Sequence, residues 1–211
     1  MKLLLLFSLV FLLAVSFVGA QETAICPFPK IDTKVPKTNN PQAEPKETCV
    51  QVTENNFPTV PDAIKNAKLK RVDGTIFSIS EYKGRPLLIH LWASWNGPAL
   101  AELPALIKLQ RQYKSSGLTV VGVNLGDLDG RAEDSETIKQ IVKRHKVTYD
   151  LVGEVDYDVM NKAIIDLTKL SSVPQTLLID RQGKFRAILI GGGKKVDEVR
   201  KQTVKNLMRE K

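Results

Sequence analysis

Cys26 and Cys49 are the two side chains in this sequence that could carry covalent redox chemistry. Disulfide exchange needs a thiolate that attacks and a second sulfur that resolves the mixed disulfide. Neither cysteine lies in a C-x-x-C motif or at a recognisable helix N-terminus, so nothing nearby would lower a thiol pKa. In an oxidising compartment such an isolated pair is typical of a structural disulfide, whose loop of about two dozen residues stabilises by roughly 3 kcal/mol. The alternative, a redox dithiol formed by this pair, stays open.

His90 and His145 are the residues that could handle protons or bind a metal. Two histidines this far apart, without neighbouring cysteines, predict no metal site, and no motif indicates a cofactor. A role in proton transfer would need a reacting group near His90, and the sequence shows none. We therefore expect His90 to be a neutral imidazole with both ring nitrogens hydrogen-bonded. His145 is expected at the edge of the core.

Residues 87–104, LLIHLWASWNGPALAELP, form the stretch around which the chain is organised. An apolar run over 87–92 ends in an Asn-Gly-Pro turn, and a pattern rich in Ala, Leu and Glu follows with helical spacing. The pattern predicts a buried strand that leads directly into a helix.

This stretch resembles the active-site segment of thioredoxin-like proteins, in particular the exported thiol-disulfide oxidoreductases of the TlpA or redoxin type. Their motif runs F-W-A-S-W-C-G-P-C-x-x-E-x-P, and eight residues fall in register with it: Trp92, Ala93, Ser94, Trp95, Gly97, Pro98, Glu102 and Pro104. Asn96 and Ala99 stand where the motif has its two cysteines. A carboxamide and a methyl group can do neither step of disulfide exchange. The resemblance therefore implies a degenerate site with no catalytic residue.

Val173-Pro174 matches the X-Pro element that is cis in thioredoxin-like proteins and packs against the C-x-x-C turn. The resemblance gives it two roles, one at the start of the following strand and one in binding. In the binding role, Val173 would offer its backbone groups to an extended peptide. Trp95 matches the tryptophan that is exposed beside the turn in this family, and with Ala99 and Pro174 it predicts an apolar recognition patch. The expected binding residues are Trp95, Gly97, Pro98, Val173 and Pro174.

Two further positions lie close to the degenerate site by resemblance. Glu102 matches the acidic residue near the active site of the redoxin type, and without thiols to tune we expect it to be an exposed carboxylate at the start of a helix. His90 stands where thioredoxins keep a buried acidic residue and redoxin-type relatives often carry Asn. It departs from both patterns.

Predicted helices and strands alternate along the rest of the chain. A hairpin is expected over 68–72 and 75–79 around the Asp73-Gly74 turn, and the Tyr82-Lys83-Gly84 segment after it also matches the redoxin type. Pro104 should bend the first long helix, and glycines 191–193 are expected to be a flexible connector. The other expected elements are helices over 98–116, 135–146, 156–167 and 196–208 and strands over 118–125, 148–152, 177–180 and 185–190. This order predicts an α/β domain with a mixed central sheet flanked by helices, and it matches the thioredoxin-like fold with an N-terminal hairpin.

The N-terminus is expected to direct the chain out of the cytoplasm. Lys2 precedes an apolar run over 3–18, and small residues follow where a signal peptidase would cut, which predicts a signal peptide over 1–20 or, alternatively, an uncleaved membrane anchor. Residues 21–62 are a Pro-rich extension that holds both cysteines, and the domain spans 63–211. The exported location is periplasmic or otherwise extracytoplasmic, and a membrane is a partner only if the N-terminal segment is uncleaved.

The net charge is +8, or +7 without the first twenty residues. Lys and Arg are scattered among Asp and Glu, with no aromatic interleaving and no nucleic-acid motif, which favours a solvated surface over a nucleic-acid partner. The leading hypothesis is an exported, redox-inactive thioredoxin-like protein that binds a peptide or protein partner or acts as a scaffold. The alternatives are a thiol-disulfide oxidoreductase of the cell envelope that uses Cys26 and Cys49, and a purely structural module.

Overall fold

The computed structural model describes residues 50–51, 59–129, 131–155, 157–168 and 170–210. The predicted signal segment, most of the Pro-rich extension, and both Cys26 and Cys49 lie outside the described residues. The predictions about them therefore stay predictions. None of the helices in the described ranges combines the length and the apolar character needed to cross a membrane.

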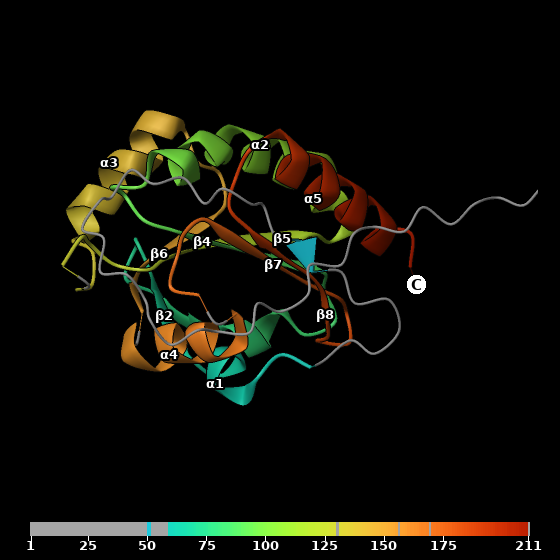
Figure 1. The fold of residues 1–211 in the computed structure, drawn as a ribbon, viewed down its shortest axis with the longest axis horizontal. Helices are drawn as coiled ribbons and strands as arrows, with labels where there is room; N and C mark the ends of the chain where they lie inside the picture. The colour runs from blue at the N-terminus through green and yellow to red at the C-terminus, as the bar shows by residue number, and fades with distance from the viewer. Residues whose placement is uncertain (1–49, 52–58, 130, 156, 169, 211) are drawn as a thin grey trace, which may run out of the picture.

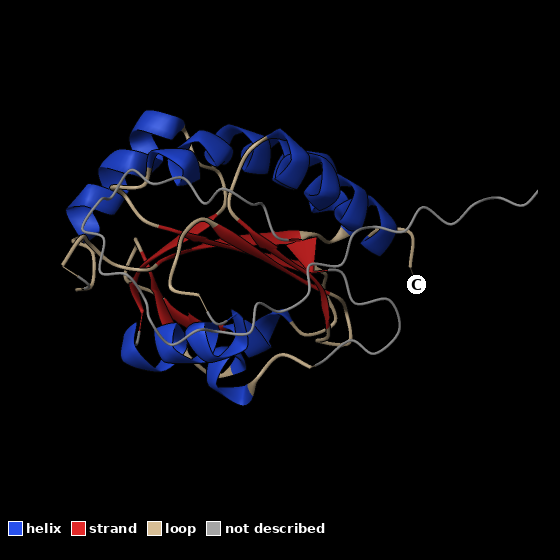
Figure 2. Ribbon diagram, in the orientation of Figure 1, coloured by secondary structure: helices blue, strands red, loops and turns tan. Residues whose placement is uncertain are grey.

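A mixed sheet of eight strands forms the middle layer of the domain (Figure 2). Its strands follow the order β1-β8-β7-β4-β5-β6-β2-β3. Pairing is parallel between β4 and β5 and between β5 and β6, and it is antiparallel elsewhere. The strands are β1 Val50–Gln51, β2 Lys68–Arg71, β3 Ile76–Ser78, β4 Leu87–Trp92, β5 Thr119–Asn124, β6 Asp150–Val155, β7 Gln175–Ile179 and β8 Phe185–Ile190.

Helices cover both faces of this sheet (Figure 1). One face carries α2 Gly97–Tyr113, α3 Ser135–His145 and α5 Lys194–Leu207, and the other carries α1 Asp62–Lys65 and α4 Tyr157–Thr168. Two short 3-10 turns, η1 Ile79–Tyr82 and η2 Lys114–Ser116, follow β3 and α2. The resulting α/β sandwich is the thioredoxin-like fold that the order of elements predicts.

Strand β4 lies at the centre of the sheet, and all six of its residues are buried. Successive side chains in a strand point to opposite faces, so Leu87, Ile89 and Leu91 join the core beneath α1 and α4. Leu88 and Trp92 instead pack beneath α2 and α5. A strand that is buried on both faces has no polar alternation, which is why the run over 87–92 is apolar except at His90.

Most predicted elements are confirmed, with small shifts of their ends. The hairpin forms as β2 and β3, and Gly74 takes a positive φ of 88° in the turn between them. Gly117, in the left-handed region at φ 97°, ends the α2–η2 segment. The strand expected over 148–152 instead runs over 150–155 as β6, where it pairs with both β5 and β2.

Candidate functional site

Asn96 occupies the turn between β4 and α2 and is the N-cap of α2. Its side-chain oxygen accepts a hydrogen bond from the Ala99 backbone N–H at 2.8 Å, which satisfies one of the free donors at the helix start. Its side-chain nitrogen donates to the Val173 carbonyl oxygen at 3.2 Å. One carboxamide therefore joins the helix start to the loop before β7, and Val173 lies beside the turn as the sequence predicts.

The Val173-Pro174 peptide bond is cis, which confirms the sequence prediction. Both residues are buried, and the Pro174 carbonyl accepts a hydrogen bond from the Gly191 N–H at 2.9 Å. A side chain on Gly192 would begin 3.6 Å from the Pro174 ring and 3.4 Å from a Glu102 oxygen. Glycines 191–193, expected to be a flexible connector, thus lie against the site through Gly191 and Gly192, whereas Gly193 is exposed.

Trp95 is the exposed aromatic residue of the site, with 40% of its surface accessible. Its indole nitrogen donates to the Gly126 carbonyl at 3.2 Å, so the ring leans on the loop after β5. The neighbouring Ser94 hydroxyl donates to the Glu133 carboxylate in the same loop. Trp92, by contrast, is fully buried, as expected for the end of the strand.

The predicted apolar patch is narrower than expected. Ala99 is fully buried under the first turn of α2, and Pro174 is buried in its loop, so neither contributes to an exposed surface. Trp95, Gly97 and Pro98 remain exposed at the turn. Ala99 points inward because helical spacing places it on the same buried side of α2 as Leu103 and Leu106.

Glu102 is buried, so the prediction of an exposed carboxylate is wrong. Its Oε1 pairs with Nη2 of Arg200, a fully buried arginine from α5. Arg200 also approaches Asp197 at 3.5 Å between Nη1 and Oδ1. A buried carboxylate persists where an opposite charge meets it, and here that partner comes from the far end of the chain.

His90 lies in the same buried layer, with its Nδ1 3.6 Å from Oε2 of Glu102. Neither ring nitrogen has a hydrogen-bond partner among the described residues, so the expectation that both are hydrogen-bonded is wrong. Burial, with the nearby positive charge of Arg200 adding to it, lowers the pKa of His90 to about 3. The imidazole is therefore neutral at ordinary pH, as expected.

The buried environment that lowers the pKa of His90 raises the pKa of the acidic groups around it. Burial raises the pKa of Glu102, and the Arg200 guanidinium partly opposes this rise. Burial likewise raises the pKa of Tyr149, whose hydroxyl has no hydrogen-bond partner in the described part of the chain. The layer beneath the turn thus holds one ion pair and several polar groups that water cannot reach.

Sequence reasoning missed Arg200 and Tyr149. The signal for Arg200 is its place on the buried side of α5, in step with Val196, Val204 and Leu207. An arginine at a core position of an amphipathic helix predicts a buried acidic partner. Tyr149 carries no such signal, because a tyrosine just before a strand is an ordinary core residue.

The described residues of the site offer hydrogen-bonding groups and an exposed aromatic ring. No cysteine belongs to the described residues, and within them no group of His, Cys, Asp or Glu side chains could hold a metal ion. Helices on both faces of a mixed sheet, together with a capped turn beside a cis-proline, define a thioredoxin-like protein. More narrowly, the chain belongs to the AhpC/TSA family, whose model matches residues 60–188.

Two curated relatives illustrate the family. The chain is 30% identical over 142 residues to the thiol-disulfide oxidoreductase ResA of Oceanobacillus iheyensis, which covers 65% of this chain and 68% of the relative. It is 36% identical over 123 residues to the thioredoxin-like protein YneN of Bacillus subtilis, covering 58% of this chain and 66% of that protein. The match thus spans about two thirds of the length of each relative, and one of the two is a thiol-disulfide oxidoreductase.

A solved structure supports the fold independently. The crystal structure of a secreted thiol-disulfide isomerase from Corynebacterium glutamicum superposes with a TM-score of 0.62 at 16% identity. The superposition covers 80% of this chain and 96% of that one. At this identity the likeness concerns the fold.

Proposed function

We propose that this chain is an exported thioredoxin-like protein that does not exchange disulfides at the β4–α2 turn and binds a polypeptide partner there. The observation that carries the proposal is the position of Asn96, whose carboxamide caps α2 and bonds to Val173. In the motif of the redoxin type this position and that of Ala99 hold the reacting cysteines. Export is supported by the apolar N-terminal segment, which has the pattern of a signal peptide.

The chemistry of the turn follows from these two replacements. A helix N-terminus stabilises a thiolate and so activates it as a nucleophile. Asn96 places a neutral amide at that point, and its two polar groups are both engaged. Ala99 brings no polar atom to the buried side. The frame that would activate sulfur is therefore kept while the sulfur is absent.

Binding is supported by what remains accessible at the turn. Trp95 presents a large ring that is held from behind by its bond to Gly126, and Gly97 and Pro98 extend the accessible surface. Tyr and Trp side chains supply much of the contact energy at protein interfaces. The Val173 carbonyl keeps a second lone pair beyond the bond to Asn96, and although Val173 is only 9% exposed, we assign this acceptor to an extended peptide.

An insulin-reduction assay with dithiothreitol tests the redox part of the proposal. We expect no acceleration by the unmodified chain. The Asn96→Cys and Ala99→Cys double variant, made in a background with Cys26→Ser and Cys49→Ser, is expected to accelerate the reaction, because a C-x-x-C pair then stands at the helix start. The matched control is the Cys26→Ser and Cys49→Ser chain alone, which should be inactive.

Two outcomes would overturn the proposal. Turnover by the unmodified chain that is lost on Cys26→Ser would assign the activity to the N-terminal pair.

Crosslinking of the full chain to an unfolded polypeptide, such as reduced and alkylated lactalbumin, tests the binding part. If Trp95→Ala gave the same crosslinking yield as the unmodified chain, the binding part would be overturned and the purely structural module would be favoured.

A further inference from the structure

The net charge of the chain lies on one side of the fold. Residues 97–116, 135–146 and 194–210 hold α2, α3 and α5 with their C-terminal ends, and they contain thirteen Lys or Arg and five Asp or Glu. Their net charge of +8 equals that of the whole chain. All three helices cover the same face of the sheet (Figure 1). The remainder of the sequence is therefore balanced, and the excess belongs to this helical layer.

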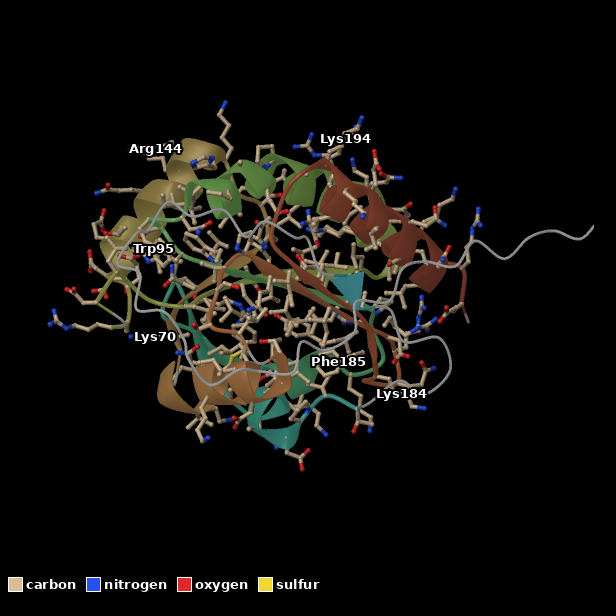
Figure 3. The ribbon with its side chains drawn as sticks, in the orientation of Figure 1. Lys70, Trp95, Arg144, Lys184, Phe185 and Lys194 are labelled. Carbon is tan, nitrogen blue, oxygen red and sulfur yellow. The ribbon has the colours of Figure 1, made fainter. Side chains whose placement is uncertain are left out.

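The cations of this layer are on its outer surface. Arg144 of α3 and Lys194 of α5 extend away from the sheet (Figure 3). The acidic residues are fewer and are partly withdrawn, since Glu102, the one acidic residue of α2, is buried against Arg200. The exposed cations are Lys108, Arg111, Lys114, Lys139, Lys143, Arg144, Lys146, Lys194, Lys195, Lys201, Lys205 and Arg209. We call this surface the basic face.

The opposite helical layer has a different charge pattern. In α1, Lys65 pairs with Asp62 at 2.6 Å, and in α4, Lys162 pairs with Asp166 at 3.1 Å. On the basic face two cations are paired within their own helix, Lys139 with Glu136 and Lys201 with Asp197. Among the described residues, most cations of the basic face form no ion pair, and the two layers give the domain a strong charge asymmetry.

We propose that the basic face docks onto an anionic phospholipid bilayer. A bilayer matches the distribution of these charges, because they spread over three helices instead of converging on a pocket. Basic residues are attracted to anionic lipid headgroups within about one Debye length of the surface. The N-terminal apolar segment, whether a signal or an anchor, brings the chain to a membrane during export.

The outer side of α2 also suits the interfacial region of a bilayer. Pro104, Ile107, Lys108, Arg111 and Gln112 line a shallow groove along this helix. Its lining combines the apolar residues Pro104 and Ile107 with the cations Lys108 and Arg111, a composition that favours headgroup contact with shallow apolar burial. Trp95 lies at the side of the layer, below Arg144 in Figure 3, so docking leaves the candidate site open.

Lysine footprinting on vesicles tests the proposal with the full chain. The protein is reconstituted with phosphatidylcholine vesicles, with or without phosphatidylglycerol, and labelled with a membrane-impermeant acetylating reagent. We expect labelling of Lys108, Lys143 and Lys194 to fall roughly fivefold relative to Lys184 on the anionic vesicles. High salt should restore the labelling, because it screens the attraction. Each molecule supplies its own reference, so partial insertion of the N-terminal segment does not change the ratio.

A pair of matched variants separates the basic face from total charge. Lys108→Gln with Arg111→Gln should raise the labelling of Lys194 on anionic vesicles towards its value on phosphatidylcholine. Lys83→Gln with Lys184→Gln removes the same charge from exposed positions outside the basic face and should leave Lys194 protected, with Lys162 then serving as reference. Equal labelling ratios on both vesicle types, or equal effects of the two variants, would overturn the proposal.

Discussion

At the scale of single residues, Asn96 makes contacts that a cysteine could not make. A thiol is a weak hydrogen-bonding group, whereas the carboxamide has one strong acceptor and two donors. Here the acceptor caps α2 and a donor reaches the Val173 carbonyl across the site. Replacement of sulfur by this amide therefore exchanges reactivity for a connection between two segments that are 77 positions apart.

Removing that connection should lower the stability of the fold. For Asn96→Ala we expect a loss of about 1 to 2 kcal/mol in the free energy of unfolding, because both the cap and the bond to Val173 disappear. Asn96→Asp keeps an acceptor for the Ala99 N–H and should recover part of the loss. It cannot donate to Val173, and its carboxylate faces that carbonyl. Urea unfolding followed by tryptophan fluorescence measures both variants, and an Asn96→Ala protein as stable as the parent would contradict this role.

At the scale of elements, the Glu102–Arg200 pair joins α2 to α5 beneath the site. Buried ion pairs contribute little net stability, since the loss of hydration offsets much of the attraction. Removing one partner is costly because the other charge is then buried alone. The pair therefore fixes how the two helices meet, and it does so next to the Gly191 to Gly193 turn that contacts Pro174.

A double-mutant cycle measures this coupling. Glu102→Leu should destabilise by about 3 to 5 kcal/mol, because it leaves the Arg200 guanidinium buried with Asp197 as its remaining acidic neighbour. Arg200→Met should cost less, since burial already favours the protonated form of Glu102. The double variant is expected to be more stable than the sum of the single losses predicts.

The control for this cycle is Lys205→Met, five residues further along α5 and exposed. It should change the free energy of unfolding by less than about 0.5 kcal/mol. Additive losses in the cycle would show that Glu102 and Arg200 contribute separately, which would rule out a coupled pair.

The sequence predicts the elements well and the buried pair poorly, for one physical reason. Helix and strand patterns are local, so the Asp73-Gly74 turn, the capped start of α2 and the strand Phe185–Ile190 follow from neighbouring residues. The burial of Glu102 depends on a helix that packs above it 98 positions later. Position in the first turns of a helix suggests exposure, and the tertiary contact with Arg200 overrides that suggestion.

At the scale of the whole molecule, the fold brings to one face basic residues that are scattered along the sequence. Basic helices alternate in the chain with buried strands and with helix α4, which holds two acidic residues and one basic residue, so the sequence has no long basic run. The β4–β5 and β5–β6 crossovers bring α2 and α3 to one face, and the helix after β8, α5, lies on the same face. A scattered pattern in sequence therefore becomes an asymmetric one in space, which no local count of charges predicts.

Acid stability is a property of the whole fold that His90 should control in part. Its pKa is about 3 in the folded state, against an ordinary value of 6.5. Between these values the unfolded chain binds one more proton at this residue than the folded chain. The contribution of His90 to the free energy of unfolding is thus at its full value above pH 6.5. It falls by about 1.4 kcal/mol per pH unit as the pH decreases from 6.5 towards 3.

Glu102 acts in the opposite direction, because a carboxyl with a raised pKa keeps its proton longer in the folded state. The two effects are separated by comparing the parent with His90→Asn, which removes the imidazole and leaves Glu102 in place. Urea unfolding between pH 7 and pH 4 should give a shallower loss of stability for His90→Asn, by close to one proton. Parallel curves for the two proteins would mean that His90 is protonated equally in both states, which its complete burial beside Arg200 argues against.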